Sequence, residues 1–308
     1  FPTRRSSDLE DKDPRAAIAA AGYKKPPKVA PEADLLTFGP SSGKTREWNP
    51  AGYYVRGQNF LVHFVLPEVG AVFESHNHPD EQLLLLIDPA TELLVKTGTE
   101  EVTVKGYSLL VIPPGSSSVK VMKTGKIQRF LTSNSAPELT KLALNAKSYE
   151  NLNEQVAPCV SWPEPINGYK VRVYSLDVPD QPGRFGRIWR TRDFMINVFA
   201  QQIGPRDKEK LSPHDHWDFE QCSVGIEGSF VHHLRWPWGT NRTEWREDQH
   251  TLAPSPSVQI IPPTVEHTTE AVGTDVNQLI DFYCPPRVDF SIMPDWVLNA
   301  DEYPMPEL

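Results

Sequence analysis

The sequence predicts an all-β fold of two consecutive barrels, and three observations support this prediction. The apolar segments are short, rich in Val, Ile, Phe and Thr, and end at Gly or Pro, which is typical of strands. Long helical periodicity is scarce. Two polar motifs recur in the same order in the two halves of the chain, which indicates an internal duplication. Two successive all-β units with many short strands are typical of barrels or sandwiches.

The composition limits the class of protein and the kind of partner. With 308 residues the chain is long enough for two domains, and its 30 prolines favour a loop-rich, mostly β protein. The net charge is -9 and no run of Lys or Arg occurs. This excludes nucleic acid and anionic membranes as main partners, because both require a basic face. The longest aliphatic run, Leu83 to Ile87, is too short to cross a bilayer, so the expected partner is a small molecule.

The cysteines are not expected to form a covalent framework. Cys159, Cys222 and Cys284 lie far apart and include no C-x-x-C pair. This spacing excludes a zinc knuckle and argues against disulfides, so we expect buried free thiols.

The N-terminal segment is expected to contain a part foreign to the protein and one short helix. Residues 1–9, FPTRRSSDL, match the translation of a common sequencing adapter, so we expect them to be non-native. The cellular compartment is therefore left open, with the cytoplasm as the default expectation. Residues 13–22, DPRAAIAAAG, predict a helix with Asp13 at its N-cap.

Strands are expected in both halves of the remaining chain. The run EQLLLLI, residues 81–87, is apolar on both faces, which suits a strand covered on one side by the other barrel. The Pro-rich stretch 157–170 marks the boundary, so we expect one domain over residues 10–160 and a second over 161–308. Further β-rich runs bounded by Gly or Pro span residues 59–70, 92–114, 228–238 and 257–263.

Two pairs of motifs define the duplication. HNHPDEQ at residues 76–82 is echoed by HDHWDFEQ at residues 214–221. VIPPGSSS at residues 111–118 is echoed by IIPPTVEH at residues 260–267. Two separate motifs that recur in the same order are hard to obtain by chance.

The second copy has the residues of a metal site. Side chains two residues apart in an extended strand point to the same side, so His214 and His216 are expected to face one cavity. An oxygen ligand after the following turn, with His267 from a distant strand, would complete a set of three nitrogens and one oxygen. This set suits one divalent transition metal, which can be Fe(II), Mn, Zn, Ni or Cu.

These motifs resemble those of the cupin superfamily, and the two copies resemble a bicupin. The family's first motif is G-x5-H-x-H-x3-4-E-x6-G, and its second is G-x5-P-x-G-x2-H-x3-N. The ending DFYCPPRVDF, residues 281–290, also resembles the close of a cupin barrel. The resemblance implies two tandem cupin-type barrels of the double-stranded β-helix, or jelly-roll, type. The positions that match the motifs are Gly70, His76, His78, Pro113 and Gly115 in the first half, and His214, His216, Gln221, Gly228, Pro262 and His267 in the second.

The oxygen ligand of the second half is either Glu220 or Gln221. Glu220 fits the three-residue version of the motif spacing, and Gln221 fits the four-residue version and the distance to Gly228. Adjacent strand residues point to opposite faces, so only one of the two is expected to be a ligand. A neutral glutamine would leave the metal more cationic and favour Lewis-acid chemistry on an anionic substrate. A glutamate would resemble the oxygen-using and decarboxylating cupins.

The first half is expected to carry a degenerate site that is empty or structural, with a distorted second metal site as the alternative. Ser118 stands where the family's second motif has its histidine, and the carboxylate position is taken by Glu81 or Gln82. Only His76 and His78 remain as imidazole ligands. Two histidines and a weak amide ligand would hold a metal poorly.

Residues near the second site are candidates for substrate binding and catalysis. Trp217, Trp236 and Trp238 have indole faces that would stack on a sugar or aromatic ring, although an interface role is the alternative. Arginines can seat a carboxylate with two parallel hydrogen bonds, and surface solvation is their alternative. The substrate-binding arginine candidates are Arg190 and Arg192, and the catalytic candidates are Glu220, His233 and Arg235.

The expected function is that of a metal-dependent enzyme acting on a small carboxylated or hydroxylated molecule, aromatic or sugar-derived. The resemblance to ring-cleaving bicupins favours a non-haem dioxygenase with Fe(II) in the C-terminal barrel. A non-redox isomerase, lyase or decarboxylase is the first alternative, and a ligand-binding bicupin without turnover is the second. Cupins commonly pair, so a homodimer is expected.

Overall fold

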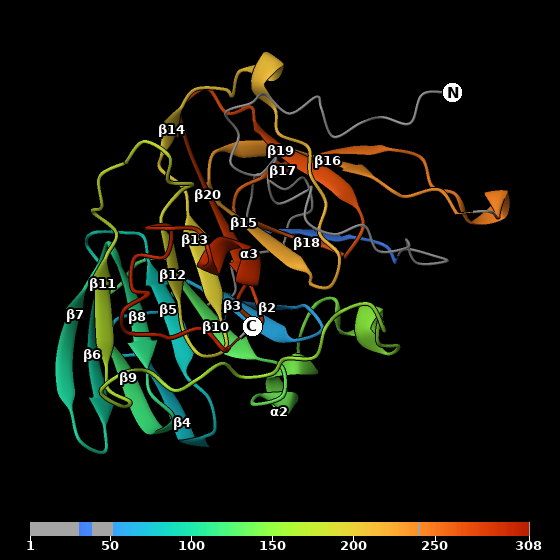
Figure 1. The fold of residues 1–308 in the computed structure, drawn as a ribbon. Coiled ribbons are helices and arrows are strands. Elements are labelled where there is room, and N and C mark those ends of the chain that lie inside the picture. Colours follow the sequence, from blue (N-terminus) through green and yellow to red (C-terminus); the bar gives the residue numbers. More distant parts are fainter. Residues whose placement is uncertain (1–30, 39–51, 240, 308) are drawn as a thin grey trace.

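A computed structural model describes residues 31–38, 52–239 and 241–307. Its regular structure is almost entirely β, arranged in four antiparallel sheets (Figure 1). The predicted all-β fold is therefore confirmed. The expected non-native segment 1–9 and the expected helix 13–22 lie outside the described residues. No helix among the described residues is long and apolar enough to cross a membrane.

The first barrel consists of a six-stranded and a four-stranded sheet. The order of the larger sheet is β11 (Arg172–Ser175), β8 (Ser108–Ile112), β5 (Gln82–Leu86), β10 (Ile127–Thr132), β3 (Phe60–Val65) and β2 (Tyr53–Arg56). The order of the smaller sheet is β4 (Val72–His78), β9 (Gly115–Lys123), β6 (Glu92–Thr97) and β7 (Glu101–Lys105).

The second barrel repeats this arrangement with a seven-stranded and a three-stranded sheet. The order of the larger sheet is β1 (Asp34–Thr37), β18 (Ser257–Ile261), β15 (Gln221–Glu227), β20 (Val276–Tyr283), β13 (Met195–Val198) and β12 (Ile188–Arg190), with β14 (Gln202–Ile203) also paired to β20. The order of the smaller sheet is β17 (Gln249–Pro254), β16 (Ser229–Arg235) and β19 (Glu266–Ala271). The short helical elements are α2 (Pro137–Thr140), η3 (Ala146–Tyr149), η4 (Lys208–Lys210), η5 (Arg242–Glu244) and α3 (Val288–Ser291).

Each large sheet includes one strand from the other half of the chain. Strand β1 precedes the first barrel but pairs with β18, with Asp34 opposite Ile260. Strand β11 follows residue 160 but pairs with β8, with Arg172 opposite Val111. These two strands therefore pair across the predicted boundary near residue 160. The domain bounds 10–160 and 161–308 stay a prediction.

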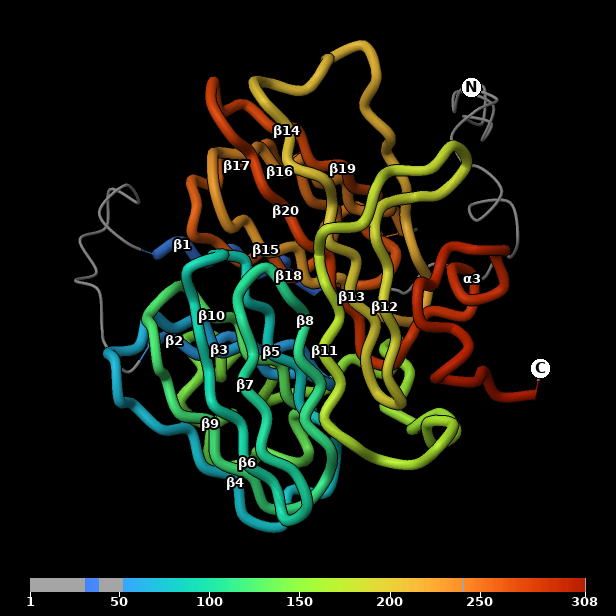
Figure 2. The backbone as a smooth tube through the Cα atoms, turned by 90° about the vertical axis from the view of Figure 1, so that its left-hand side faces the viewer, coloured from blue at the N-terminus to red at the C-terminus, as the bar shows by residue number. Residues whose placement is uncertain are grey.

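The two large sheets pack face to face and share one hydrophobic core (Figure 2). Phe282 lies at its centre and contacts aromatic rings from both barrels. Its ring centroid is 4.4 Å from that of Phe130, 5.4 Å from that of Phe60 and 5.4 Å from that of Phe194. The small sheets lie on the outer sides, so each barrel also has an interior of its own (Figure 2).

Successive side chains of a strand point alternately to the core between the barrels and to the interior of their own barrel. In β5, Leu83 and Leu85 belong to the core between the barrels, whereas Leu84 and Leu86 belong to the interior of the first barrel. This confirms that EQLLLLI is covered on both faces. In β15, the core between the barrels contains Cys222, Val224 and Ile226. The residues of opposite phase, which begin with Gln221, therefore face the interior of the second barrel.

Candidate functional site

The structure brings together the three histidines predicted for the second barrel. The backbone N–H of His214 donates to the carbonyl of His267 at 3.0 Å, and the N–H of His267 donates to the carbonyl of His214 at 2.8 Å. The ring centroid of His267 lies 4.5 Å from that of His214 and 4.9 Å from that of His216. The HDH segment is thus fastened to the start of β19, which explains how a distant histidine joins the pair.

Backbone carbonyls orient two of the three rings. His214 Nδ1 lies 3.0 Å from the carbonyl oxygen of Ser212, and His267 Nδ1 lies 2.8 Å from that of Val265. A carbonyl only accepts, so each Nδ1 donates and each neutral ring keeps its lone pair on Nε2. This is the usual way in which a protein holds an imidazole for a metal.

His216 is buried without a hydrogen-bond partner for either ring nitrogen. Burial is the main reason that its pKa is held well below the ordinary value, and the nearby His267, Arg287 and His214 lower it further. Its ring stacks on Phe219 at 4.3 Å between centroids. A neutral imidazole is the form that binds a metal ion.

Gln221, and not Glu220, lies beside the histidines. Its Oε1 accepts a hydrogen bond from the Tyr283 hydroxyl at 3.2 Å and lies 3.3 Å from His267 Nε2. Its Nε2 donates to Ser223 Oγ at 3.1 Å, and Ser223 in turn donates to Asp281 at 2.6 Å, which fixes the orientation of the amide. Gln221 Oε1 and His267 Nε2 therefore lie close enough for both to bind one cation.

Glu220 points into the contact between the barrels. Its carboxylate accepts hydrogen bonds from the backbone N–H of Gln58 at 2.6 Å and from the Tyr149 hydroxyl at 2.9 Å. Glu81 repeats this pattern from the first barrel, with the Tyr303 hydroxyl at 2.8 Å and the N–H of Arg192 at 3.3 Å. Burial raises the pKa of both carboxyls to about 7. These two glutamates connect the barrels and are not brought to the histidine sites.

The raised pKa of Glu81 predicts a dependence of stability on pH. Its carboxyl is protonated more readily in the folded protein than in the unfolded chain, where the ordinary value of 4.5 applies. The resulting stabilisation is complete below that value and is lost as the pH rises through about 7. We expect the urea midpoint of the wild type to fall between pH 5 and pH 8, and Glu81→Gln to remove part of this fall. A variant at the exposed Glu68, Glu68→Gln, should retain it, and an unchanged fall in Glu81→Gln would contradict the prediction.

The three imidazoles and the amide oxygen are donors that suit a divalent metal, although their ligand atoms are not all close enough to bind one ion. In the described part of the chain, no group of three or more His, Cys, Asp or Glu side chains is already spaced to hold a metal ion. The centroids of His214 and His216 are 6.5 Å apart. Ligation therefore requires side-chain rotation, and neither ring nitrogen of the buried His216 has a hydrogen bond to lose.

A cavity of about 670 Å³ opens onto this site. His214, Gln221 and His267 line it, together with Arg184 and Arg206 from loops of the second barrel. The guanidinium of Arg206 is held by the carbonyls of Thr269 and Lys210 and by Ser212 Oγ, at 2.8 to 3.1 Å. The two arginines were not predicted from the sequence, because neither belongs to a motif or to a strand pattern.

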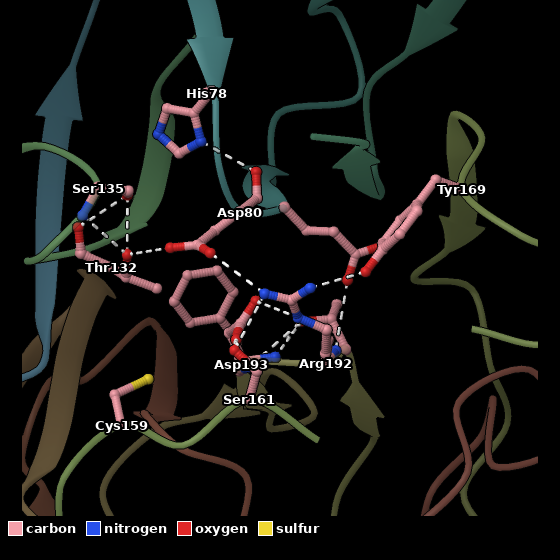
Figure 3. A network of polar contacts seen from close by, with 12 residues as sticks. His78, Asp80, Thr132, Ser135, Cys159, Ser161, Tyr169, Arg192 and Asp193 are labelled. Carbon is pink, nitrogen blue, oxygen red and sulfur yellow. Dashed lines mark hydrogen bonds and ion pairs between the residues drawn. The ribbon is translucent and has the colours of Figure 1, made fainter. Parts of the chain in front are cut away.

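The predicted substrate-binding residues do not line this cavity. Arg190 is buried and donates to the Tyr303 carbonyl. Arg192 pairs with Asp80 at 3.3 Å and Asp193 at 3.4 Å where the barrels meet (Figure 3). The three tryptophans make other contacts. The Trp236 indole donates to the carbonyl of Pro31, and the Trp238 indole stacks on Trp245 at the exposed surface. The backbone carbonyl of Trp217 accepts a hydrogen bond from the Gln155 amide.

The catalytic candidates of strand β16 face outward. His233 lies 2.8 Å from His250 and 3.2 Å from Glu270, and Arg235 forms an ion pair with Asp248. The histidine of β16 on the buried face of the strand is His232, which was not predicted from the sequence. It is buried, and its Nδ1 lies 3.0 Å from Thr269 Oγ1 on the cavity wall. Burial, with smaller effects of His267 and His233, lowers its pKa to about 3.

The residues predicted as a degenerate site in the first barrel do not converge. The side chain of His76 is 82% exposed and points to solvent near Glu74. His78 donates from Nδ1 to the carbonyl of Asp80 at 2.9 Å, and the Gln82 amide pairs with Ser75 Oγ. Ser118 lies in the middle of β9, between Glu74 and Lys96 of the neighbouring strands.

Comparisons with known proteins found solved structures with a similar fold. No family model and no curated protein matches the chain. The solved structure of AerE from Microcystis aeruginosa is 12% identical, with a TM-score of 0.51 over 84% of this chain and 100% of that chain. An oxalate decarboxylase in complex with formate from Lactobacillus farciminis is 12% identical, with a TM-score of 0.45 over 87% of this chain and 85% of that chain. A cupin 2 conserved barrel domain protein from Leptotrichia buccalis is 8% identical, with a TM-score of 0.39 over 82% and 89%.

At these identities the similarity concerns the fold alone. The two barrels, each formed by a large and a small antiparallel sheet and packed through the large sheets, follow the order expected from the duplicated motifs. The chain therefore has the fold of a bicupin, with two tandem cupin-type barrels.

Proposed function

We propose that the protein is a metal-dependent cupin-type enzyme whose centre lies in the second barrel. The observation that carries the proposal is that His214, His267 and the Gln221 amide oxygen line the cavity of about 670 Å³, with the buried ring of His216 beside His267. His214, His216, His267 and Gln221 would hold one divalent transition metal, with Fe(II), Mn, Zn, Ni and Cu all compatible with these donors. When bound, the metal would supply Lewis acidity to the substrate.

The neutral amide favours non-redox chemistry. Gln221 contributes no charge to the ligand set, and the acidic neighbour Glu220 is bound to the other barrel. A more cationic metal polarises a carboxylate, carbonyl or hydroxyl oxygen more strongly. We therefore place a lyase, isomerase or decarboxylase first and the Fe(II) dioxygenase expected from the sequence second.

The walls of the cavity support a small anionic substrate. Arg184 and Arg206 line the same cavity as the histidines, and the partners of Arg206 hold its guanidinium in place. A guanidinium binds carboxylates through paired, charge-assisted hydrogen bonds. The proposed substrate is therefore a carboxylated or hydroxylated small molecule. We also propose that two copies of the chain form a homodimer, as the resemblance to cupins implies.

Turnover with and without oxygen distinguishes the proposed reaction classes. We expect the metal-loaded protein to convert one member of a panel of uronates and hydroxy acids at the same rate under nitrogen and in air. Stoichiometric O2 uptake with a catechol or hydroxybenzoate would overturn the non-redox assignment and favour the dioxygenase. A panel that binds but stays chemically unchanged would indicate a ligand-binding protein.

A further inference from the structure

A second cavity, of about 240 Å³, lies at the mouth of the first barrel. It shares no residue with the cavity lined by His214 and His267. Its polar lining includes Arg129, His78, Gln82 and Ser75, with Glu74 and Glu138. We propose that this cavity binds a small monocarboxylate, and that Arg129 is the residue that recognises it.

Arg129 is a buried cation that has no carboxylate partner within residues 31–38, 52–239 and 241–307. It is 7% exposed, and its strand face is that of Ile127 in the first barrel's interior. Its guanidinium lies 3.2 Å from His63 Nδ1 through Nη1 and 4.6 Å above the ring of Phe73, and its Nε has no hydrogen-bond partner. Among the described residues no acidic side chain forms an ion pair with it. An unpaired buried charge is costly, and an arginine remains charged even when burial lowers its pKa, as it does here.

The other buried arginines of the described residues have carboxylate or carbonyl partners, as Arg190 has in the carbonyl of Tyr303. Arg172 and Arg287 pair with Glu302 and Asp289. Arg187 donates to three backbone carbonyls, those of Leu176, Val198 and Phe199. Arg129 differs from these in lining a cavity while no described residue provides it with a carboxylate or carbonyl partner, and a guanidinium in such a place can bind an anion.

His78 supplies a second recognition element. Its Nδ1 donates to the Asp80 carbonyl, as Figure 3 shows, so the neutral ring has its lone pair on Nε2. That Nε2 is buried and has no partner. His78 and Arg129 line the same cavity, and an imidazole lone pair together with a guanidinium would suit a ligand with both a carboxylate and a hydroxyl donor. The Gln82 amide, paired with Ser75, is already occupied.

Size and charge restrict the ligand further. The volume is below the roughly 300–1,000 Å³ typical of pockets for larger ligands, so it suits an acid of only a few heavy atoms. Glu74 and Glu138 also line the cavity, with side chains 63% and 82% exposed. These two carboxylates disfavour dianions such as phosphate. A short hydroxy acid such as glycolate fits all of these features.

Calorimetric titration with glycolate, acetate and inorganic phosphate tests the proposal on the full chain. We expect glycolate to bind more tightly than acetate and phosphate to bind weakest. Arg129→Met should weaken glycolate binding by at least about tenfold, because hydrogen bonds to charged groups contribute substantially. The titrations use metal-free protein, so that no metal in the second barrel can bind the hydroxy acid, and His267→Ala should then leave glycolate binding unchanged. The exposed Arg242→Met is the matched control and should also bind normally.

Thermal unfolding gives a second readout that does not depend on the variant's affinity. Without ligand, Arg129→Met should be at least as stable as the wild type, because replacing an unpaired buried charge by a hydrophobic side chain removes a desolvation penalty. Glycolate should raise the melting temperature of the wild type and not that of Arg129→Met. Equal glycolate binding by the two proteins, or preferential binding of phosphate, would overturn the proposal.

Discussion

Replacing His267 by alanine is expected to lower the affinity of the second barrel for its metal by more than about 100-fold, because changes at residues that only orient a ligand already cost about 10–100-fold. His267 is central to the site, since its ring lies between those of His214 and His216 and beside the Gln221 oxygen. Turnover should fall with metal content. Competition with a chromophoric chelator measures the affinity of each variant.

A histidine outside the cavity provides the matched control. His250 is exposed and contacts His233 on the outer face of β16 and β17, so His250→Ala should bind metal as the wild type does. Equal losses in His250→Ala and His267→Ala would place the metal elsewhere. Retention of full affinity by a folded His267→Ala would contradict the proposed ligand set.

Replacing Phe282 by alanine is expected to destabilise the protein by about 3–5 kcal/mol, the usual cost of removing a buried phenyl ring. The ring is fully buried and contacts three phenylalanines, two of which belong to the other barrel. The lost packing should therefore weaken the attachment of the two large sheets. Urea unfolding followed by circular dichroism measures the change.

The control for this core position is an exposed apolar residue. Leu252 lies on β17 with its side chain in solvent, so Leu252→Ala should change stability by no more than about 0.5 kcal/mol. A loss smaller than about 1 kcal/mol in Phe282→Ala would show that the core between the barrels does not hold them together.

Much of the fold follows from patterns that are visible in the sequence. The repeated His-x-His and Pro-Pro motifs identify two copies of one barrel, and the β-rich runs fall on strands. The exchanged strands β1 and β11 were not predicted. Each has only four residues, and its place is decided by pairing with β18 or β8 rather than by a local pattern.

The sequence alone does not decide whether Glu220 or Gln221 faces the histidines. In EQCSVGIE, the apolar Cys222, Val224 and Ile226 share the phase of Glu220, so alternation separates the two candidates. The sequence does not say which face of this strand meets the other barrel, because both faces of β15 are buried. Only the packing of the large sheets sets Gln221 beside His267.

The substrate-binding and catalytic candidates near the second motif lie away from the cavity for a related reason. Trp236 is buried in a small hydrophobic cluster, whereas Trp238 and Arg235 lie on the exposed side of a hairpin that turns outward from the barrel (Figure 1). The cavity arginines, Arg184 and Arg206, come from loops whose positions depend on the completed fold. No local spacing predicts such residues.

Elemental analysis of the wild-type protein, purified without a metal-affinity tag, tests the central claim most directly. The proposed centre predicts one divalent transition metal per chain, held until a chelator removes it and lost from His267→Ala. A folded wild-type protein that takes up no stoichiometric transition metal, even when Fe(II), Mn, Zn, Ni and Cu are each supplied, would contradict it.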